Sequence, residues 1–336
     1  MPLDPLLVPL LEALNAEPRP VLERPEDVYA VRAEIAERKA AGDPVAAFIE
    51  PGPDVSTEDD VVEVDAPPGE IAVRIYRGDR SRDEAAPPGG LVVYHGGGWC
   101  LNSMEDSDNR CRWFAAHAGV VVVNVEYRLA PEYPFPTPLE DCYQALVWTA
   151  DNADRLGIDA RRIGVAGDSA GANLAAGVTL LARERGGPPL RFQLLEIPGL
   201  DLTLSSPSVD LYPDGHILEV EDVRWCVRTY LDGHDPGDAL ASPVLAEDLS
   251  GLPPAFIASA ECDPLCDDGR RYAERLSAAG VPVTHREYAG QVHSSHALTA
   301  LLPTAREWRA NVVAAVREHL GEPAAEPAPT PSTPVG

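Results

Sequence analysis

Short apolar runs alternate with longer amphipathic segments along most of this 336-residue chain. The apolar runs are rich in valine and isoleucine, which predicts strands. They cover residues 61–64, 71–75, 91–94, 120–125, 163–166, 192–197, 255–258 and 283–288. Helices are expected between them, at residues 108–118, 139–152, 170–185, 268–279 and 304–320. This order predicts an α/β fold in which helices flank a mostly parallel central sheet.

The same pattern separates exposed from buried elements. Residues 61–64 and 71–75 alternate apolar and polar side chains, which is typical of half-exposed edge strands. Residues 120–123 are all valine, so this strand is expected to be buried on both faces. Residues 5–14 and 25–41, before the first strand, have helical periodicity and could simply pack on the outside of the sheet.

Composition excludes several partner classes. With 54 acidic and 27 basic residues, the formal charge of −27 argues against nucleic acid or an anionic membrane as a partner. The amino terminus has no basic segment followed by a continuous apolar one, so a cytoplasmic protein without stable membrane association is expected. The six cysteines are scattered and are expected to be small core residues. No metal or cofactor is expected.

A glycine-flanked serine occupies the junction between a predicted strand and a predicted helix. The sequence Gly167-Asp168-Ser169-Ala170-Gly171 follows the strand at 163–166 and opens the helix at 170–185. This setting is typical of a nucleophile elbow, a tight turn that exposes the serine hydroxyl at the edge of a sheet. An ordinary glycine-rich turn is the alternative.

A second glycine-rich loop favours catalysis. The strand at 91–94 runs into His95-Gly96-Gly97-Gly98-Trp99. Such a loop can direct bare backbone N–H groups at an oxyanion, which forms in the tetrahedral intermediate of acyl transfer. Ser169 also needs a base, because a neutral hydroxyl is a poor nucleophile, and the base needs a group that orients it.

Several motifs in one order resemble the hormone-sensitive-lipase-like branch of the α/β-hydrolase superfamily, in its bacterial esterase form. The resemblance covers residues 60 to 320 and rests on the two glycine motifs, on Tyr127-Arg128-Leu129-Ala130-Pro131-Glu132, on Asp263-Pro264-Leu265 and on His293. It implies an α/β-hydrolase fold with a helical cap. Residues 1–50 would form an amino-terminal cap segment and residues 51–320 the catalytic domain, with a cap insertion at about 203–240. Residues 321–336, which have almost nothing to bury, are expected to be a disordered tail.

The resemblance also implies the remaining site residues. His293 would be the base and Asp263 the orienting acid, both placed after strands, and the chain order Ser, Asp, His fits the fold. Ser294-Ser295-His296 departs from the family's usual sequence after the histidine, so His296 is the alternative base. Glu261, Asp267 and Asp268 are alternatives to Asp263, although Asp267 or Asp268 also suits the cap of the next helix. The oxyanion donors would be the N–H groups of Gly97, Gly98 and Ala170, supported by His95, Gly96 and Asp168.

These residues predict a serine carboxylic-ester hydrolase, a carboxylesterase that acts through an acyl-enzyme on small short- to medium-acyl esters. Apolar residues between 211 and 230 could line a lid or an acyl cavity, and ordinary packing explains them equally well. A deacetylase or amidase of a specialised metabolite would use the same residues. A non-catalytic small-molecule receptor on this fold is a further alternative, and homodimer formation is left open.

Overall fold

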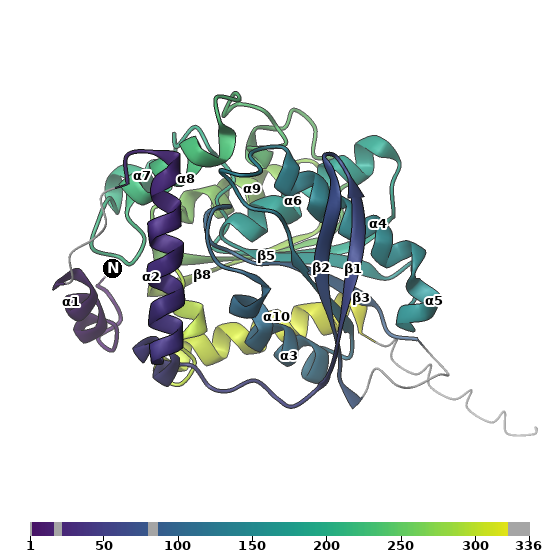
Figure 1. The fold of residues 1–336 in the computed structure, drawn as a ribbon, viewed down its shortest axis with the longest axis horizontal. Coiled ribbons are helices and arrows are strands. Elements are labelled where there is room, and N and C mark those ends of the chain that lie inside the picture. Colours follow the sequence, from purple (N-terminus) through teal and green to yellow (C-terminus); the bar gives the residue numbers. More distant parts are fainter. Residues whose placement is uncertain (1, 17–21, 80–86, 322–336) are drawn as a thin grey trace, which may run out of the picture.

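An eight-stranded sheet forms the centre of the protein in a computed structural model that describes residues 2–16, 22–79 and 87–321 (Figure 1). The strand order is β1-β2-β4-β3-β5-β6-β7-β8. β2 pairs antiparallel with both β1 and β4, and the other neighbours are parallel. The strands are β1 Ser56–Asp65, β2 Pro68–Arg77, β3 Gly90–Tyr94, β4 Val121–Glu126, β5 Ile163–Asp168, β6 Leu190–Glu196, β7 Ala255–Cys262 and β8 Val283–Val292. The predicted mostly parallel sheet is confirmed.

Burial along the strands follows their position in the sheet. β4 is buried from Val121 to Val125, as its run of valines predicts. β1 is largely exposed and lies at the edge. The prediction that residues 71–75 form an edge strand is wrong, because β2 lies between β1 and β4. Its alternation arises because only one of its faces meets the core.

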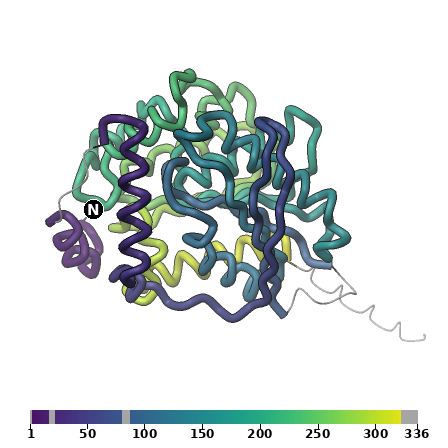
Figure 2. Tube along the Cα trace, in the orientation of Figure 1, coloured from purple at the N-terminus to yellow at the C-terminus, as the bar shows by residue number. Residues whose placement is uncertain are grey.

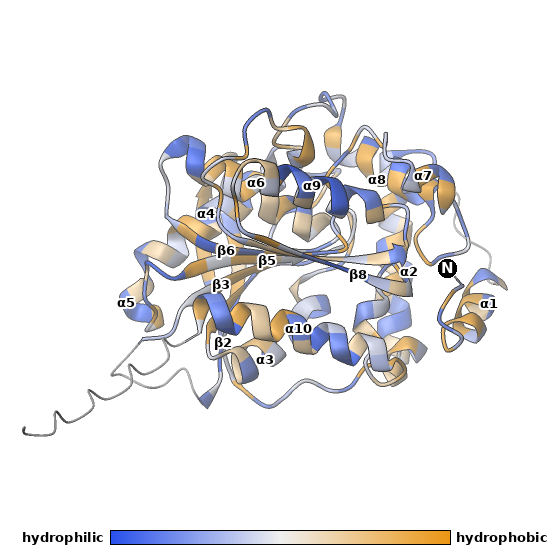
Figure 3. Cartoon of the chain, turned by 180° about the vertical axis from the view of Figure 1, so that it is seen from behind, coloured by the Kyte–Doolittle hydropathy of each residue, from blue (hydrophilic) through white to orange (hydrophobic). Residues whose placement is uncertain are grey.

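Helices cover both faces of the sheet, and their apolar sides face it (Figure 3). α3 and α10 pack together on one face, where they share an apolar core with β3 and β6. α4, α6 and α9 lie on the opposite face (Figure 1). The bounds are α3 Met104–Ala118, α4 Thr137–Asp151, α5 Ala153–Leu156, α6 Ala170–Arg185, α9 Cys266–Ala278 and α10 Pro303–Leu320. Five of these six were predicted to within four residues, and the short α5 was not.

The amino-terminal helices lie beside a much later part of the chain. α2 (Val28–Ala41) stands next to α7 (Ser208–Leu211) and α8 (Val220–Leu231) in Figure 2, where purple and green segments meet. Asn15 of α1 (Val8–Ala16) donates to the carbonyl of Gly215, between α7 and α8, at 3.3 Å. The indole Nε1 of Trp225 in α8 donates to the carbonyl of Arg24 at 3.1 Å and joins the two segments. α8 was not predicted as a helix, since its apolar residues were expected only to line a lid or to pack.

The carboxyl ends of four parallel strands place the residues singled out in the sequence at one edge of the sheet. His95 follows β3, Ser169 follows β5, Asp263 follows β7 and His293 follows β8. In open α/β sheets ligands bind at this edge. β8 continues beyond the predicted strand at 283–288 as far as Val292, and its register with β7 shifts near this end.

Candidate active site

Ser169 sits in a strained turn between β5 and α6. Its φ of 52° lies in the left-handed region, which a non-glycine residue adopts at a cost of about 1–3 kcal/mol. The serine N–H donates to the carbonyl of Glu196 at 2.8 Å. Gly171 packs so closely on the carbonyl of Tyr94 at the end of β3 that any side chain would collide with it. The glycine therefore lets the helix start against the neighbouring strand, as the elbow motif predicts.

Ser169, His293 and Asp263 form a chain of hydrogen bonds (triad) across three strand ends. His293 Nε2 lies 3.0 Å from Ser169 Oγ, and His293 Nδ1 lies 2.7 Å from Asp263 Oδ2. The other carboxylate oxygen of Asp263 accepts the N–H of Leu265 at 2.9 Å. Asp263 is fully buried and His293 is 5% exposed. With its proton on Nδ1, the neutral imidazole has Nε2 free to accept the hydroxyl proton.

The alternative base and two of the alternative acids occupy other places. His296 lines a different cavity from Ser169, and its Nδ1 has no partner in the described chain. Glu261 accepts the N–H of Gly290. Asp268 caps a loop in another part of the chain, since it accepts the N–H groups of Leu200 and Asp201, so the suggestion that it caps its own helix is wrong.

Asp267, the third alternative acid, accepts the N–H of Ser208 at 2.9 Å and pairs with Arg270. Like Glu261 and Asp268, it makes no contact with His293 in the hydrogen bonds of the described chain. Of these four acidic residues, only Asp263 is bonded to the histidine next to Ser169.

Three backbone N–H groups line the cavity beside Ser169. They belong to Gly97, Gly98 and Ala170. The first two donate to no other group in the described chain, and the third opens α6, where an N–H has no partner within the helix. The φ of Gly98 is 59°, which favours glycine. Cys226 Sγ of α8 also lies where the Cβ of any other residue would be, so there is no room for a side chain.

The residues around these donors hold the loop in place. Tyr127 Oη donates to the carbonyl of His95 at 2.7 Å, and the two rings stack. His95 Nδ1 lies 2.8 Å from the carbonyl of Gly96, and burial lowers the pKa of His95, so the ring stays neutral. The carboxylate of Asp168 packs against Gly96. These contacts agree with supporting rather than reacting roles for His95 and Asp168.

Arg110 of α3 is an ion-pair partner that sequence reasoning missed. It donates to Asp168 at 2.8 Å and to Glu196 at 3.0 Å. Burial alone would raise the pKa of Asp168, but Arg110 and, to a smaller extent, the nearby histidines together outweigh it and hold that pKa below the ordinary value. No local motif marks Arg110, because its partners come from β5 and β6.

A cavity of about 340 Å³ opens above Ser169, and we call it the Ser169 cavity. Its floor is made by the strand-end loops, and its roof by the amino-terminal segment and the region before and within α8. The roof side chains are mostly apolar: Leu22, Val31, Ile217, Leu218, Val223 and Trp225. The apolar residues of the insertion therefore have two different roles. Ile217 and Leu218 line this cavity, whereas Tyr230 is buried against Trp99.

Neither a cluster of metal-binding side chains nor a membrane-spanning helix is found among the described residues. They hold no group of three or more histidine, cysteine, aspartate or glutamate side chains suited to a metal ion. No helix among residues 2–16, 22–79 and 87–321 is long and apolar enough to cross a bilayer. All six cysteines are free thiols, and only Cys226 is not fully buried.

Several known proteins that are similar to this chain are named as esterases or ester hydrolases. A family model described as the alpha/beta hydrolase fold matches residues 91–297. The esterase LipI of Mycobacterium tuberculosis is 43% identical over 73% of this chain and 77% of its own. The ethyl acetate hydrolase of Pseudomonas putida is 38% identical over 74% of this chain and 79% of its own.

Solved structures of esterases have the same fold as this chain. A hyperthermophilic esterase from the archaeon Pyrobaculum calidifontis superposes with a TM-score of 0.82 and 37% identity, over 95% of this chain and 99% of its own. The sequence match and the fold therefore point to one relationship, and the predicted fold class is confirmed. The chain belongs to the α/β-hydrolase family, in its hormone-sensitive-lipase-like branch.

Proposed function

We propose that this protein is a serine carboxylesterase whose nucleophile is Ser169. The observation that carries the proposal is the unbroken hydrogen-bonded chain from Ser169 through His293 to Asp263, which ends in a cavity lined by free backbone donors. A hydroxyl, a base, an orienting acid and an oxyanion site are the parts that acyl transfer needs. The esterases among its relatives support the reaction class.

The first half of the reaction acylates the serine. Ser169 Oγ attacks the ester carbonyl while His293 Nε2 takes the hydroxyl proton. The carbonyl oxygen becomes negative and accepts the N–H groups of Gly97, Gly98 and Ala170. Asp263 holds His293 Nδ1–H and stabilises the imidazolium. The imidazolium then protonates the leaving alkoxide, and the alcohol departs.

The second half releases the acid. Water attacks the acyl-enzyme while His293 Nε2 takes one of its protons. The same three N–H groups hold the second oxyanion, and collapse of that intermediate expels Ser169 Oγ, which recovers its proton from His293. The carboxylic acid leaves and the enzyme is restored. Besides the ester and water, every group in these steps belongs to the chain itself.

The size and lining of the Ser169 cavity favour small esters. A cavity of about 150 Å³ holds benzene, so the 340 Å³ here accommodates roughly a dozen non-hydrogen atoms. Its apolar roof has no cationic side chain among the lining residues of the described chain. We therefore infer short- to medium-acyl esters without an anionic group as substrates.

The helices around the roof support a cap function for residues 1–50 and for the insertion at about 203–240. α2 and α8 come from these segments and cover the strand-end loops (Figure 1). This division, a cytoplasmic location and homodimer formation stay predictions. The tail expected at 321–336 lies outside the described residues apart from Gly321.

A series of p-nitrophenyl esters from acetate to dodecanoate tests the proposal. The enzyme should hydrolyse the short and medium members, with kcat/KM falling once the acyl chain outgrows the cavity. Ser169→Ala should lower kcat by about 10⁴-fold or more. Ser294→Ala is the matched control, since Ser294 lines the same cavity without bonding to His293. Unchanged hydrolysis by Ser169→Ala would remove the mechanism.

A further inference from the structure

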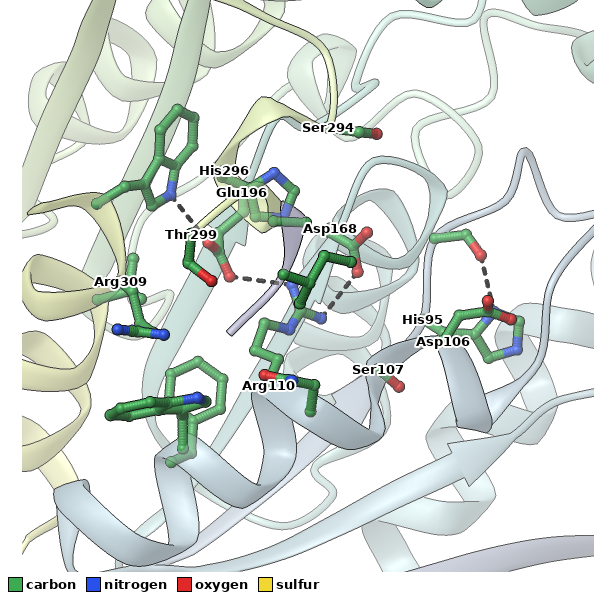
Figure 4. Close-up of a pocket in the computed structure, with 18 of the residues that line it drawn as sticks. His95, Asp106, Ser107, Arg110, Asp168, Glu196, Ser294, His296, Thr299 and Arg309 are labelled. Atoms are coloured by element: carbon green, nitrogen blue, oxygen red, sulfur yellow. Dashed lines mark hydrogen bonds and ion pairs between the residues drawn. The ribbon is translucent and has the colours of Figure 1, made fainter. Parts of the chain in front are cut away.

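A second cavity lies behind the catalytic loops, on the face of the sheet that α3 and α10 cover. Figure 4 shows its side chains converging from α3, α10 and the ends of β5 and β6. Its volume is about 180 Å³. Asn102, Asp168 and Ser294 line both this cavity and the Ser169 cavity, whereas Ser169 and His293 line only the latter. The two cavities are therefore neighbours with separate interiors.

Ion pairs form one wall of the second cavity. Arg110 bridges Asp168 and Glu196, and Trp308 Nε1 donates to Glu196 at 2.9 Å (Figure 4). Arg309 of α10 donates to Glu50 at 2.5 Å and stacks 3.6 Å above the ring of Trp113. These contacts fix the side chains that face the cavity.

Several side chains that line this cavity have nitrogen atoms without a hydrogen-bond partner in the described chain. Five buried nitrogens in the wall have no hydrogen-bond partner in the described chain: His95 Nε2, Arg110 Nε, Trp113 Nε1, His296 Nδ1 and Arg309 Nη1. His95 itself is only 1% exposed. A buried polar group left without a partner destabilises the folded state, because it has lost its hydrogen bonds to water. Because these five atoms belong to residues that line one cavity, the protein alone does not satisfy the hydrogen-bonding groups of this wall.

Three of these nitrogens can only donate, so the missing partner must offer acceptors. The arginine and tryptophan N–H groups have no lone pair to share. An anion would meet repulsion, because three carboxylates, Glu50, Asp168 and Glu196, stand against the two guanidiniums. Burial lowers the pKa of His296, as it does for His95, so the histidines add no positive charge. The charges thus favour an uncharged acceptor.

The rest of the wall is apolar and sets the shape of the occupant. Phe114, Val312, Val313 and Ile49 line it together with the indoles of Trp113 and Trp308. At about 180 Å³ the space slightly exceeds the roughly 150 Å³ that holds benzene. We propose that this second cavity is a binding site for a small uncharged carbonyl compound with one aromatic or aliphatic ring, whose oxygen accepts from Arg110 Nε, Trp113 Nε1 and Arg309 Nη1.

The second cavity is separate from the Ser169 cavity, where the ester would bind. Its occupant would contact the back of Asp168, the residue before Ser169, while the Ser169 cavity stays open. An ester and the second ligand can therefore be bound at the same time. This inference does not rest on the proposed function, since the cavity and its unpaired donors exist whether or not Ser169 reacts.

Binding of cyclopentanone, a ring carbonyl compound small enough for the cavity, followed by saturation-transfer-difference NMR titration of the full chain, tests the proposal. Saturable binding at one site is expected. Ala297→Trp, at an exposed position on the wall of the second cavity, should weaken binding at least tenfold because the indole occupies its space. Trp113→Phe removes one donor and keeps the ring that stacks under Arg309, so it should weaken binding roughly fivefold, the value of one hydrogen bond.

Leu204→Trp, which fills part of the Ser169 cavity, is the matched control and should leave the dissociation constant unchanged. In ester hydrolysis the probe should not raise KM, because it does not compete for the Ser169 cavity. Three results would overturn the proposal: no saturable binding, which means that the cavity holds water only; binding lost in Leu204→Trp but kept in Ala297→Trp; or simple competition with the ester.

Discussion

The strand-end loops and the segments that cover them are built in different ways. The loops that carry Ser169, Asp263 and His293 are buried and tied by hydrogen bonds to one another and to neighbouring backbone. The covering segments meet the same cavity mainly through apolar side chains such as Val31 and Leu218. The contrast indicates that the reaction is set by the loops, and that the size of the ester is set by the cover.

A few polar contacts join the two regions. Arg32 of α2 donates to the carbonyls of Cys100 and Ala130, both at 2.8 Å, and so connects the cover to the oxyanion loop. Cys226 of α8 presses on Gly98. If the contrast holds, substitutions in the loops should change kcat strongly, and those in the cover should change the choice of substrate.

The largest effect is expected at His293. His293→Gln removes the base, and in a related triad this loss costs about 10⁶-fold in kcat. His296→Gln serves as the control and should change kcat less than about fivefold, because His296 lies outside the Ser169 cavity. Steady-state hydrolysis of p-nitrophenyl butyrate measures both. If the two variants lost activity equally, the assignment of the base would be wrong.

Gly98→Ala should have the next largest effect. The new Cβ would meet Cys226 Sγ, and the positive φ would strain the loop, so the oxyanion N–H groups would move. Losing one such donor costs about 10²–10³-fold in kcat. Adding Cys226→Ala removes the sulfur but leaves a Cβ 3.0 Å away, so it should restore part of the loss. Kinetics of the single and double variants check this coupling, and a double variant no better than Gly98→Ala would contradict it.

Leu218→Trp should alter substrate choice with little effect on the chemistry. The larger side chain narrows the roof of the Ser169 cavity, so kcat/KM for octanoate relative to acetate should fall roughly tenfold, within the range that one or two methylene groups can give. Leu211→Trp on α7, an exposed position outside the cavity, is the control. An unchanged octanoate-to-acetate ratio would mean that the cover does not set the acyl length.

The smallest expected effect is on how the free energy of unfolding depends on pH. Asp268 accepts N–H groups from the loop that carries Leu202 of the Ser169 cavity, and burial raises its pKa to about 7 from 3.8. The folded state therefore holds a proton that the unfolded state has lost, so this carboxyl lowers the free energy of unfolding as pH rises from about 4 to 7. Its contribution is fully present only below about pH 4.

Asp268→Asn keeps an acceptor for both N–H groups but cannot ionise. Its free energy of unfolding in urea should fall less between pH 5 and pH 8 than that of the parent protein. Ser277→Ala, at an exposed position of the same helix that carries no titratable group, should retain the parent slope. If the free energy of unfolding fell equally with pH in the parent protein and in Asp268→Asn, the carboxyl would not be protonated in the folded state.

What could be predicted from the sequence was local. The elbow around Ser169 and the loop at Gly97 and Gly98 are short motifs that can be recognised from neighbouring residues alone, and the strands are marked by runs of valine. The strand order was harder to predict: residues 71–75 alternate like an edge strand because one face of β2 is exposed, yet β2 lies inside the sheet between β1 and β4.

Long-range partnerships could not be read from the chain. Arg110 is one arginine among many until folding brings the ends of β5 and β6 to it. Asp268 suits a helix cap by its position, but its hydrogen bonds go to residues about 67 positions away. The second cavity depends on side chains from α3, α10 and two strand ends, and no spacing rule joins them.

The most direct test of the account is the site of covalent labelling. Incubation with a p-nitrophenyl phosphonate, followed by intact-mass and peptide mass spectrometry, should give one adduct per chain, located on Ser169, with loss of hydrolysis in step with labelling. Phosphonates report on a serine activated by its base and oxyanion donors. A folded enzyme that hydrolyses esters while Ser169 stays unlabelled, or that carries the adduct on another residue, would contradict it.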